Sequence, residues 1–139
     1  MSEIRTDGSL KRLVINGDPN RVIEFDPSDV LFIEKFYQLF RDFEAKQAEI
    51  TKRAEELDEE NKRLADAGEP LNLAGGLTFL REVCTFLREG IDGLFGEGTS
   101  QKTFGDSLSL DAITQFFDGV GPHIWETRSL KIKRYNKHP

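Results

Sequence analysis

The chain has 139 residues, of which 37% are hydrophobic and 32% charged, and this composition supports one globular domain with a single core. It contains no apolar run of about 18 residues, which excludes a membrane-spanning helix, and its first residues lack the apolar stretch of a secretory signal. Cys84 is the only cysteine, so we expect no disulfide within the chain, as in proteins of a reducing cytoplasm.

Charge is distributed unevenly along the chain. The last twelve residues carry +5 with no acidic residue, and because the whole chain carries −6, residues 1–127 carry −11. An acidic body repels the phosphate backbone, so we expect no broad nucleic-acid binding and treat nucleic acid as an unlikely partner. The basic residues could still contact an anionic partner, or fold back on the acidic body; they are Arg128, Lys131, Lys133, Arg134 and Lys137.

A β-hairpin is predicted near the N-terminus, after a flexible lead-in of residues 1–9. Residues 10–15 and 21–25 form two short runs rich in β-branched side chains, separated by residues 16–20. The Asn16-Gly17 pair provides the left-handed dihedral angles of a tight turn, and Pro19 disfavours a regular helix here. A hairpin this small requires packing against helices.

One uninterrupted helix is predicted from Asp26 to Asp66. Asp26 is the expected N-cap and Pro27 the first helical residue, and Ala67-Gly68-Glu69-Pro70 is expected to end the helix. Its apolar residues are separated by threes and fours or by whole heptads, which places them on one helical face. They are Ile33, Phe36, Phe40, Phe43, Ile50, Ala54, Leu57 and Leu64.

The rest of the chain predicts two further helices. The first runs from Leu73 or Leu77 to about Gly93 with two apolar faces, so we expect it to be the most buried helix and the centre of a bundle. After a glycine-rich link over residues 94–108, Ser109 caps another helix, which Gly119, Gly121 and Pro122 should kink or break.

The expected fold is therefore mainly α, with an N-terminal β-hairpin, one long helix and a bundle of two to three shorter helices. Residues 10–127 form the single domain. Residues 128–139 form a basic C-terminal tail, and the alternation of Leu130-Lys131-Ile132-Lys133 suits a short edge strand equally well.

No arrangement of residues indicates catalysis, and we predict neither an enzyme nor a cofactor or metal site. Residues 96–103 match a phosphate-binding loop except that Gln101 replaces the second glycine, and a helix precedes them where that loop requires a strand. The two histidines, His123 and His138, lack zinc-ligand spacing. The acidic residues near position 58 lie on a predicted exposed helix face, where charge serves solvation.

The outer half of the long helix narrows to a thin apolar seam formed by Phe43, Ile50, Leu57 and Leu64. The polar Gln47 and Asn61 also occupy seam positions, as in helices that specify a pairing register. The helix spans about 60 Å and its neighbour only about 30 Å at 1.5 Å per residue. We therefore expect part of the seam to remain uncovered and to bind another chain. The same length difference fits equally well with an arm that protrudes without binding a partner.

One segment resembles a known family. The segment ends in the pattern D-x-x-F-G-x-G-T and reads Phe86-Leu87-Arg88-Glu89-Gly90-Ile91-Asp92-Gly93-Leu94-Phe95-Gly96-Glu97-Gly98-Thr99. A turn that contains F-G follows at Lys102-Thr103-Phe104-Gly105, and the next predicted helix contains the pair Phe116-Phe117. This arrangement is similar to the small tail assembly chaperones of long-tailed (siphovirus-type) phages and prophages of Gram-positive bacteria. The resemblance covers about residues 20 to 125. The basic tail does not align.

The resemblance implies a non-enzymatic role in the host cytoplasm. Such chaperones coat the helical tape-measure protein and keep it soluble while tail-tube subunits assemble, they often self-associate, and they are expected to be absent from the mature virion. The partner surface that we infer from the residues is Phe43, Ile50, Leu57 and Leu64 with the basic Arg128, Lys131, Lys133 and Arg134. The alternative is a nucleic-acid-associated phage protein that acts through the basic tail.

Overall fold

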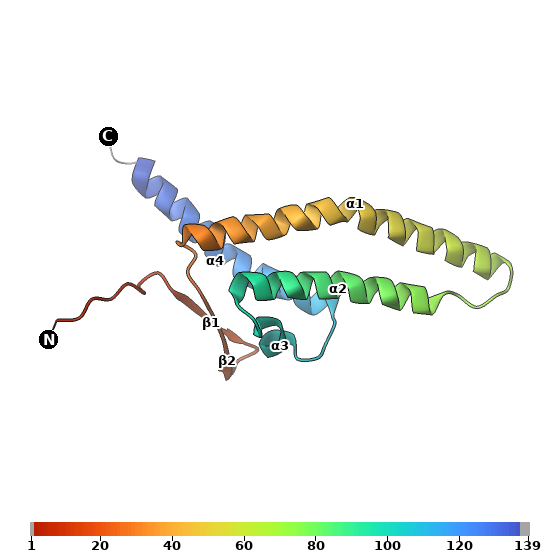
Figure 1. The fold of residues 1–139 in the computed structure, drawn as a ribbon, viewed down its shortest axis with the longest axis horizontal. Coiled ribbons are helices and arrows are strands. Elements are labelled where there is room, and N and C mark those ends of the chain that lie inside the picture. The colour runs from red at the N-terminus through yellow and green to blue at the C-terminus, as the bar shows by residue number, and fades with distance from the viewer. Residues whose placement is uncertain (1, 137–139) are drawn as a thin grey trace.

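The fold is described from a computed structural model (Figure 1), which covers the backbone of residues 2–136 and the side chains of residues 2–125. The predicted fold class is confirmed, because an antiparallel hairpin precedes one long helix and several shorter ones. In chain order the elements are β1 (Lys11–Ile15), β2 (Asp18–Phe25), α1 (Val30–Asp66), α2 (Leu73–Phe95), α3 (Thr99–Phe104) and α4 (Leu110–Asn136). Within residues 2–136 we find no helix with a stretch long and apolar enough to cross a bilayer.

The hairpin turns at the predicted Asn-Gly pair. Asn16 and Gly17 have φ values of 50° and 72°, and both values are left-handed, as a two-residue hairpin turn requires. β2 begins at Asp18, earlier than the predicted residue 21, so Pro19 lies inside the strand. A register shift between Val14 and Ile15 accommodates the extra residues of β2.

The N-cap of α1 lies three residues after the predicted one, and the helix begins at Val30. Asp29 is the cap, and its carboxylate accepts from the backbone N–H of Leu31 at 3.0 Å. The Asp26 carboxylate accepts instead from the backbone N–H of Ser28, which closes a turn ahead of the helix. The predicted end of the helix is confirmed: Gly68 has a φ of 71°, and the N–H of Glu69 donates to the carbonyl of Leu64 at 2.8 Å.

The core lies where the inner ends of α1 and α2 meet β2 and α4. Phe25, Phe32 and Phe95 stack or meet edge-on with ring centroids 5.5–5.6 Å apart. The other buried apolar side chains come from all of these elements: Ile23, Phe36, Cys84, Leu87, Ile91, Leu94, Ile113, Phe116, Val120 and Ile124. We call this part of the molecule the body.

α2 has its expected central position, because it contacts α1, α3, α4 and β2, but the expectation that it is the most buried helix is wrong. Its buried residues are Cys84, Leu87, Ile91 and Leu94, all in the second half of the helix. The first half runs beside α1 outside the body, in an antiparallel pair that a short link closes at residues 67–72 (Figure 1).

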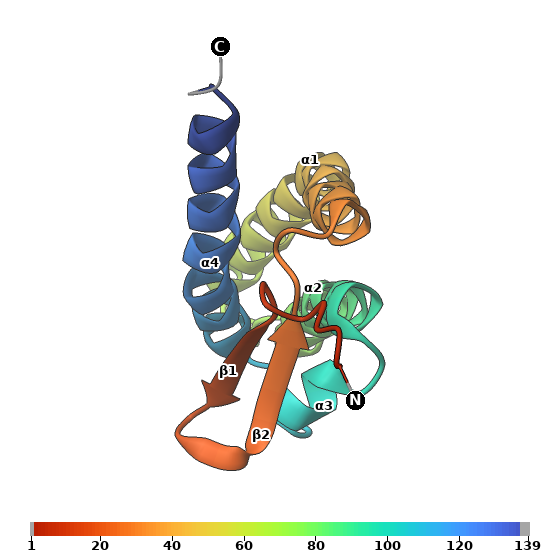
Figure 2. The same cartoon turned by 90° about the vertical axis from the view of Figure 1, so that its left-hand side faces the viewer.

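The expected break in the last helix is also wrong. α4 continues through Pro122 to Asn136, and Figure 2 shows it as one column that extends past α1. Pro122 is exposed, while Val120 and Ile124 are 2% and 1% exposed and anchor the helix to the body. This packing offsets the hydrogen bond that proline removes. Residues 128–136, predicted as a tail or a strand, are helical, and their side chains lie outside the described ones.

Candidate binding surface on the helical arm

The outer parts of α1 and α2 form a two-helix arm, residues 44–82, that projects from the body (Figure 1). No residue between positions 37 and 83 is buried, in contrast to the body. A pair of helices buries only the side chains between them, and no third element of residues 2–136 covers the remaining apolar side chains of the arm. Apolar side chains that the chain itself leaves uncovered are therefore expected on the arm.

The inner face of the arm is held by a mixture of apolar and charged contacts. Arg53 of α1 makes an ion pair with Glu82 of α2, and its guanidinium lies 5.2 Å from the ring centroid of Phe79. The hydrogen bond from Arg53 lowers the pKa of Glu82 below its usual value. Lys46 lies over the Phe86 ring at 4.7 Å. These contacts fix the register of the two helices.

Asn72 holds the tip of the arm together. Its backbone N–H donates to the side-chain oxygen of Asn61 at 2.8 Å, and its own side-chain oxygen accepts from the N–H of Gly75 at 2.9 Å, which caps α2. Asn61 therefore uses its side chain within the chain. Its polar position in the seam, which we interpreted as a signal for helix pairing, corresponds to pairing between α1 and α2.

The structure places the predicted seam of α1 against α2. Phe43 packs on the edge of the core, and Ile50 lines a shallow groove with Phe79 and Val83. Leu57 and Leu64 are half-buried, and Leu57 lines a groove with Gly75 and Thr78 of α2. The chain itself covers one side of this seam, and its role in binding a partner stays a prediction. For Arg128, Lys131, Lys133 and Arg134 only the helical backbone is described.

A more exposed apolar surface lies on α2. Leu73, Leu77 and Leu80 are 71%, 68% and 47% exposed, and their spacing of four and three places them on one helical face. The same alternation of four and three continues through Cys84, Leu87, Ile91 and Leu94, which are buried in the body. The seven residues thus form one stripe, covered at its inner end and bare at its outer end. We call Leu73, Leu77 and Leu80 the bare stripe.

The stripe becomes bare where the rest of the chain stops covering it. The thiol of Cys84 donates to the backbone carbonyl of Leu108 at 3.6 Å, so the link before α4 lies against the last covered position. α4 begins at Leu110 and runs toward the body from there. Leu108 and Leu110 are themselves 37% and 41% exposed. The chain contains no further helix to continue along α2 within the described residues.

The sequence contained the signal for this surface. The alternation of four and three continues along α2 from Leu73 to Leu94, so the helix carries one apolar face over almost its whole length. We assigned the unpaired length to α1, because α1 is the longer helix. The structure instead uses one face of α1 to pair with α2 and leaves a second face of α2 open.

The glycine-rich loop forms a structural turn. Gly96 and Gly98 have φ values of 113° and 87°, and the carboxylate of Asp92 accepts from the backbone N–H of Ser100 at 2.8 Å. An acidic side chain therefore occupies the start of α3, where a phosphate group would have to bind. Among the described residues, no group of three or more His, Cys, Asp or Glu could hold a metal ion.

Comparison with known proteins identifies the family of the chain. A protein-family model matches residues 20–138, and its description is a family of unknown function, DUF6673. The chain belongs to this family. The matched region begins in β2 and includes the arm, the bare stripe and the core. Comparisons with curated proteins and with solved structures found no match for this DUF6673 member.

Proposed function

We propose that the protein is a non-enzymatic binding protein whose bare stripe captures an amphipathic helix of a partner. The observation that carries this proposal is the continuous stripe on α2, of which the inner four residues are buried by the chain and the outer three are left open. A helix of another protein that packs along Leu73, Leu77 and Leu80 would extend the packing already present in the body. Full burial of each leucine would contribute about 1.5–3 kcal/mol.

The partner we propose is the phage tape-measure protein, and the role is that of a tail assembly chaperone. The sequence resemblance over residues 20 to 125 supports this role, and the exposed stripe suits a partner that is itself a long amphipathic helix. In this proposal the chain acts in the bacterial host cytoplasm, self-associates, contacts tail-tube subunits in passing and is absent from the mature virion. The net charge of −6 helps to keep such a complex soluble.

Co-expression tests the proposal directly. The tape-measure protein of a long-tailed phage or prophage that encodes this chain is expressed in bacteria with and without the chain, and the soluble fraction of the tape-measure protein is measured. We expect the chain to raise the soluble fraction and to co-purify with the tape-measure protein. Equal solubility in both cultures, with no co-purification, would contradict the chaperone role.

A nucleic-acid-binding role through the basic C-terminal residues is the second candidate. The observation in its favour is that α4 extends as a helix to Asn136 and so carries these residues away from the acidic body (Figure 2). Deletion of residues 128–139 separates the two functions, because it removes nucleic-acid affinity but leaves binding of the tape-measure protein intact. Phosphate contacts would also make the affinity fall steeply with added salt.

A further inference from the structure

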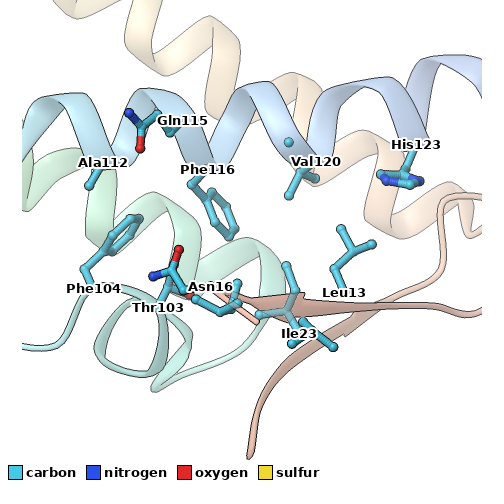
Figure 3. A pocket seen from close by; sticks show the side chains of 13 residues that line it. Leu13, Asn16, Ile23, Thr103, Phe104, Ala112, Gln115, Phe116, Val120 and His123 are labelled. Carbon is cyan, nitrogen blue, oxygen red and sulfur yellow. The ribbon is translucent and has the colours of Figure 1, made fainter. Parts of the chain in front are cut away.

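A groove lies between the hairpin and α4, distant from the arm (Figure 3). Its volume is about 370 Å³, and it is lined by Leu13, Val14, Ile15 and Asn16 on one side and by residues of α4 between Ala112 and His123 on the other. Thr103, which is 8% exposed, also lines it, and its Oγ1 has no hydrogen-bond partner among the described residues. The groove is open and has both apolar and polar side chains in its lining.

Among residues 2–136, no strand pairs with the edge of β1 beside this groove. β2 pairs with β1 on one side, and its other side faces α3, where Arg21 donates to the carbonyls of Lys102 and Thr103. Figure 2 shows β1 on the side of the sheet away from α3. A free strand edge offers backbone N–H and C=O groups to an additional strand, and a hairpin gains stability from a third strand.

The segment before β1 is exposed and is attached where it could provide that strand. Residues 2–8 are exposed, the segment leads away from the body in Figure 1, and Ile4 is 90% exposed. The chain is fixed to the body directly after it, because the hydroxyls of Ser9 and Ser28 lie 3.0 Å apart. A turn is already closed there, since the N–H of Leu10 donates to the carbonyl of Asp7 at 3.1 Å.

We propose that residues 2–7 dock on the free edge of β1 as a third antiparallel strand and place Ile4 in the groove. A two-residue turn at Gly8-Ser9 pairs Asp7 with Leu10 and therefore Ile4 with Leu13. Directly opposite residues share a face of the sheet. The side chain of Leu13 packs toward the core on the face of the groove, whereas Val14 is 53% exposed, so Ile4 shares the face of Leu13 and enters the groove. The same register brings Ser2 opposite Ile15, at the end of the groove near Asn16 and Thr103 (Figure 3).

Gly8 is the hinge of this rearrangement. Gly-Ser suits a type II′ hairpin turn, in which the first central residue has a positive φ. Gly8 does not have a positive φ in the present structure, in contrast to Gly17 at the other turn. Rotation at Gly8 alone therefore changes the direction of the segment, and glycine is the residue that allows it at little cost. A Cβ at Gly8 would meet no atom within 4 Å, so Gly8→Ala leaves the open form unstrained.

Disulfide trapping in the full-length chain tests the proposal. The double variant Glu3→Cys/Val14→Cys places two cysteines directly opposite each other in the proposed register, on the face of the sheet away from the groove. It leaves Ile4 and Leu13 unchanged. Opposite Cα atoms lie about 5.5 Å apart, within the range of a disulfide. The control Ser2→Cys/Val14→Cys is one residue out of register. The native Cys84 is 1% exposed and does not compete.

Under mild oxidation of dilute protein we expect an intrachain disulfide to form at least about tenfold faster in the in-register pair than in the control, because only that pair has both cysteines on one face. Adding Gly8→Ala should remove this difference. Equal rates in the two pairs, or no cross-link in either, would overturn the proposal. A disulfide between chains would also overturn it, because the groove would then belong to a second copy. Amide hydrogen exchange of the unmodified chain provides a second measurement: protection of the N–H groups of Glu3 and Arg5, which this register directs at β1, is expected, and exchange of both at the free rate would contradict docking.

Discussion

The body and the arm are built from the same two helices, yet they differ in what covers them. In the body, α1 and α2 are packed by β2, α3 and α4, and Phe36 and Ile91 are 2% and 0% exposed. In the arm the two helices have only each other, and no side chain is buried. One sequence pattern, apolar residues at helical spacing, thus specifies a core at one end and an exposed apolar face at the other. The difference depends on where the covering elements stop.

The largest expected effect lies in the body. Phe36→Ala should lower the free energy of unfolding by about 3–5 kcal/mol, because it leaves a cavity in a ring cluster that includes Phe32 and Phe40. Urea denaturation followed by circular dichroism measures this loss. A loss below about 1 kcal/mol would mean that the aromatic cluster is not the stabilising core.

A matched substitution in the arm should cost less and act locally. Ile50→Ala removes a half-buried side chain that faces Phe79 and Val83, so we expect a loss of about 1 kcal/mol, at the low end for truncation of a large side chain. Hydrogen exchange should speed up within residues 44–82 and stay unchanged in the buried half of α2. If exchange rose equally in both regions, the arm and the body would form one cooperative unit.

Two glycines of α2 provide a finer comparison of packing. A Cβ at Gly90 would overlap the side chain of Leu39 on α1, whereas a Cβ at Gly93 would meet no atom within 4 Å. Gly93→Ala should therefore raise the free energy of unfolding by about 0.5–1 kcal/mol through helix propensity. Gly90→Ala should lower it by about 1 kcal/mol through overpacking. Thermal unfolding of the two variants gives the signs, and the same sign for both would contradict the close approach of α1 and α2.

The smallest expected effect concerns pH. Burial raises the pKa of the Cys84 thiol above its usual value of 9.0, so the folded chain retains a proton that the unfolded chain releases. The stability contributed by the neutral thiol is complete below the unfolded pKa and is lost as the pH rises above 9.0 toward the folded pKa. Denaturation at pH 8 and at higher pH should show a shallower decline for Cys84→Ala than for the unmodified chain, and identical slopes would contradict this burial.

Local signals predicted most of the elements correctly. Asn16-Gly17 and Gly68 each require a backbone conformation that their residue types favour, so the turn and the helix end could be inferred without tertiary information. The continuation of α4 through Pro122 could not, because it depends on the burial of Val120 and Ile124 against the body. Tertiary packing of this kind overrides the local preference of a proline.

The sequence placed the candidate surface on α1, whereas the more exposed apolar face of the arm lies on α2. Periodicity showed that both α1 and α2 carry apolar faces, and it could not show which faces meet. That pairing follows from contacts between side chains far apart in sequence, such as Arg53 with Glu82 and Asn61 with Asn72. The point at which α4 begins to cover α2 is likewise set by the contact between Cys84 and Leu108.

The most direct test of the account measures partner binding by a chain without the bare stripe. The triple variant Leu73→Asp/Leu77→Asp/Leu80→Asp is compared with a control, Val30→Asp/Leu31→Asp, whose side chains are 64% and 66% exposed but lie at the start of α1. Both variants should remain folded, since none of these side chains is buried. We predict that the triple variant binds the tape-measure protein at least about 100-fold more weakly by isothermal titration calorimetry, while the control binds like the unmodified chain. Unchanged affinity in the triple variant, or an equal loss in the control, would contradict the assignment of the binding surface to α2.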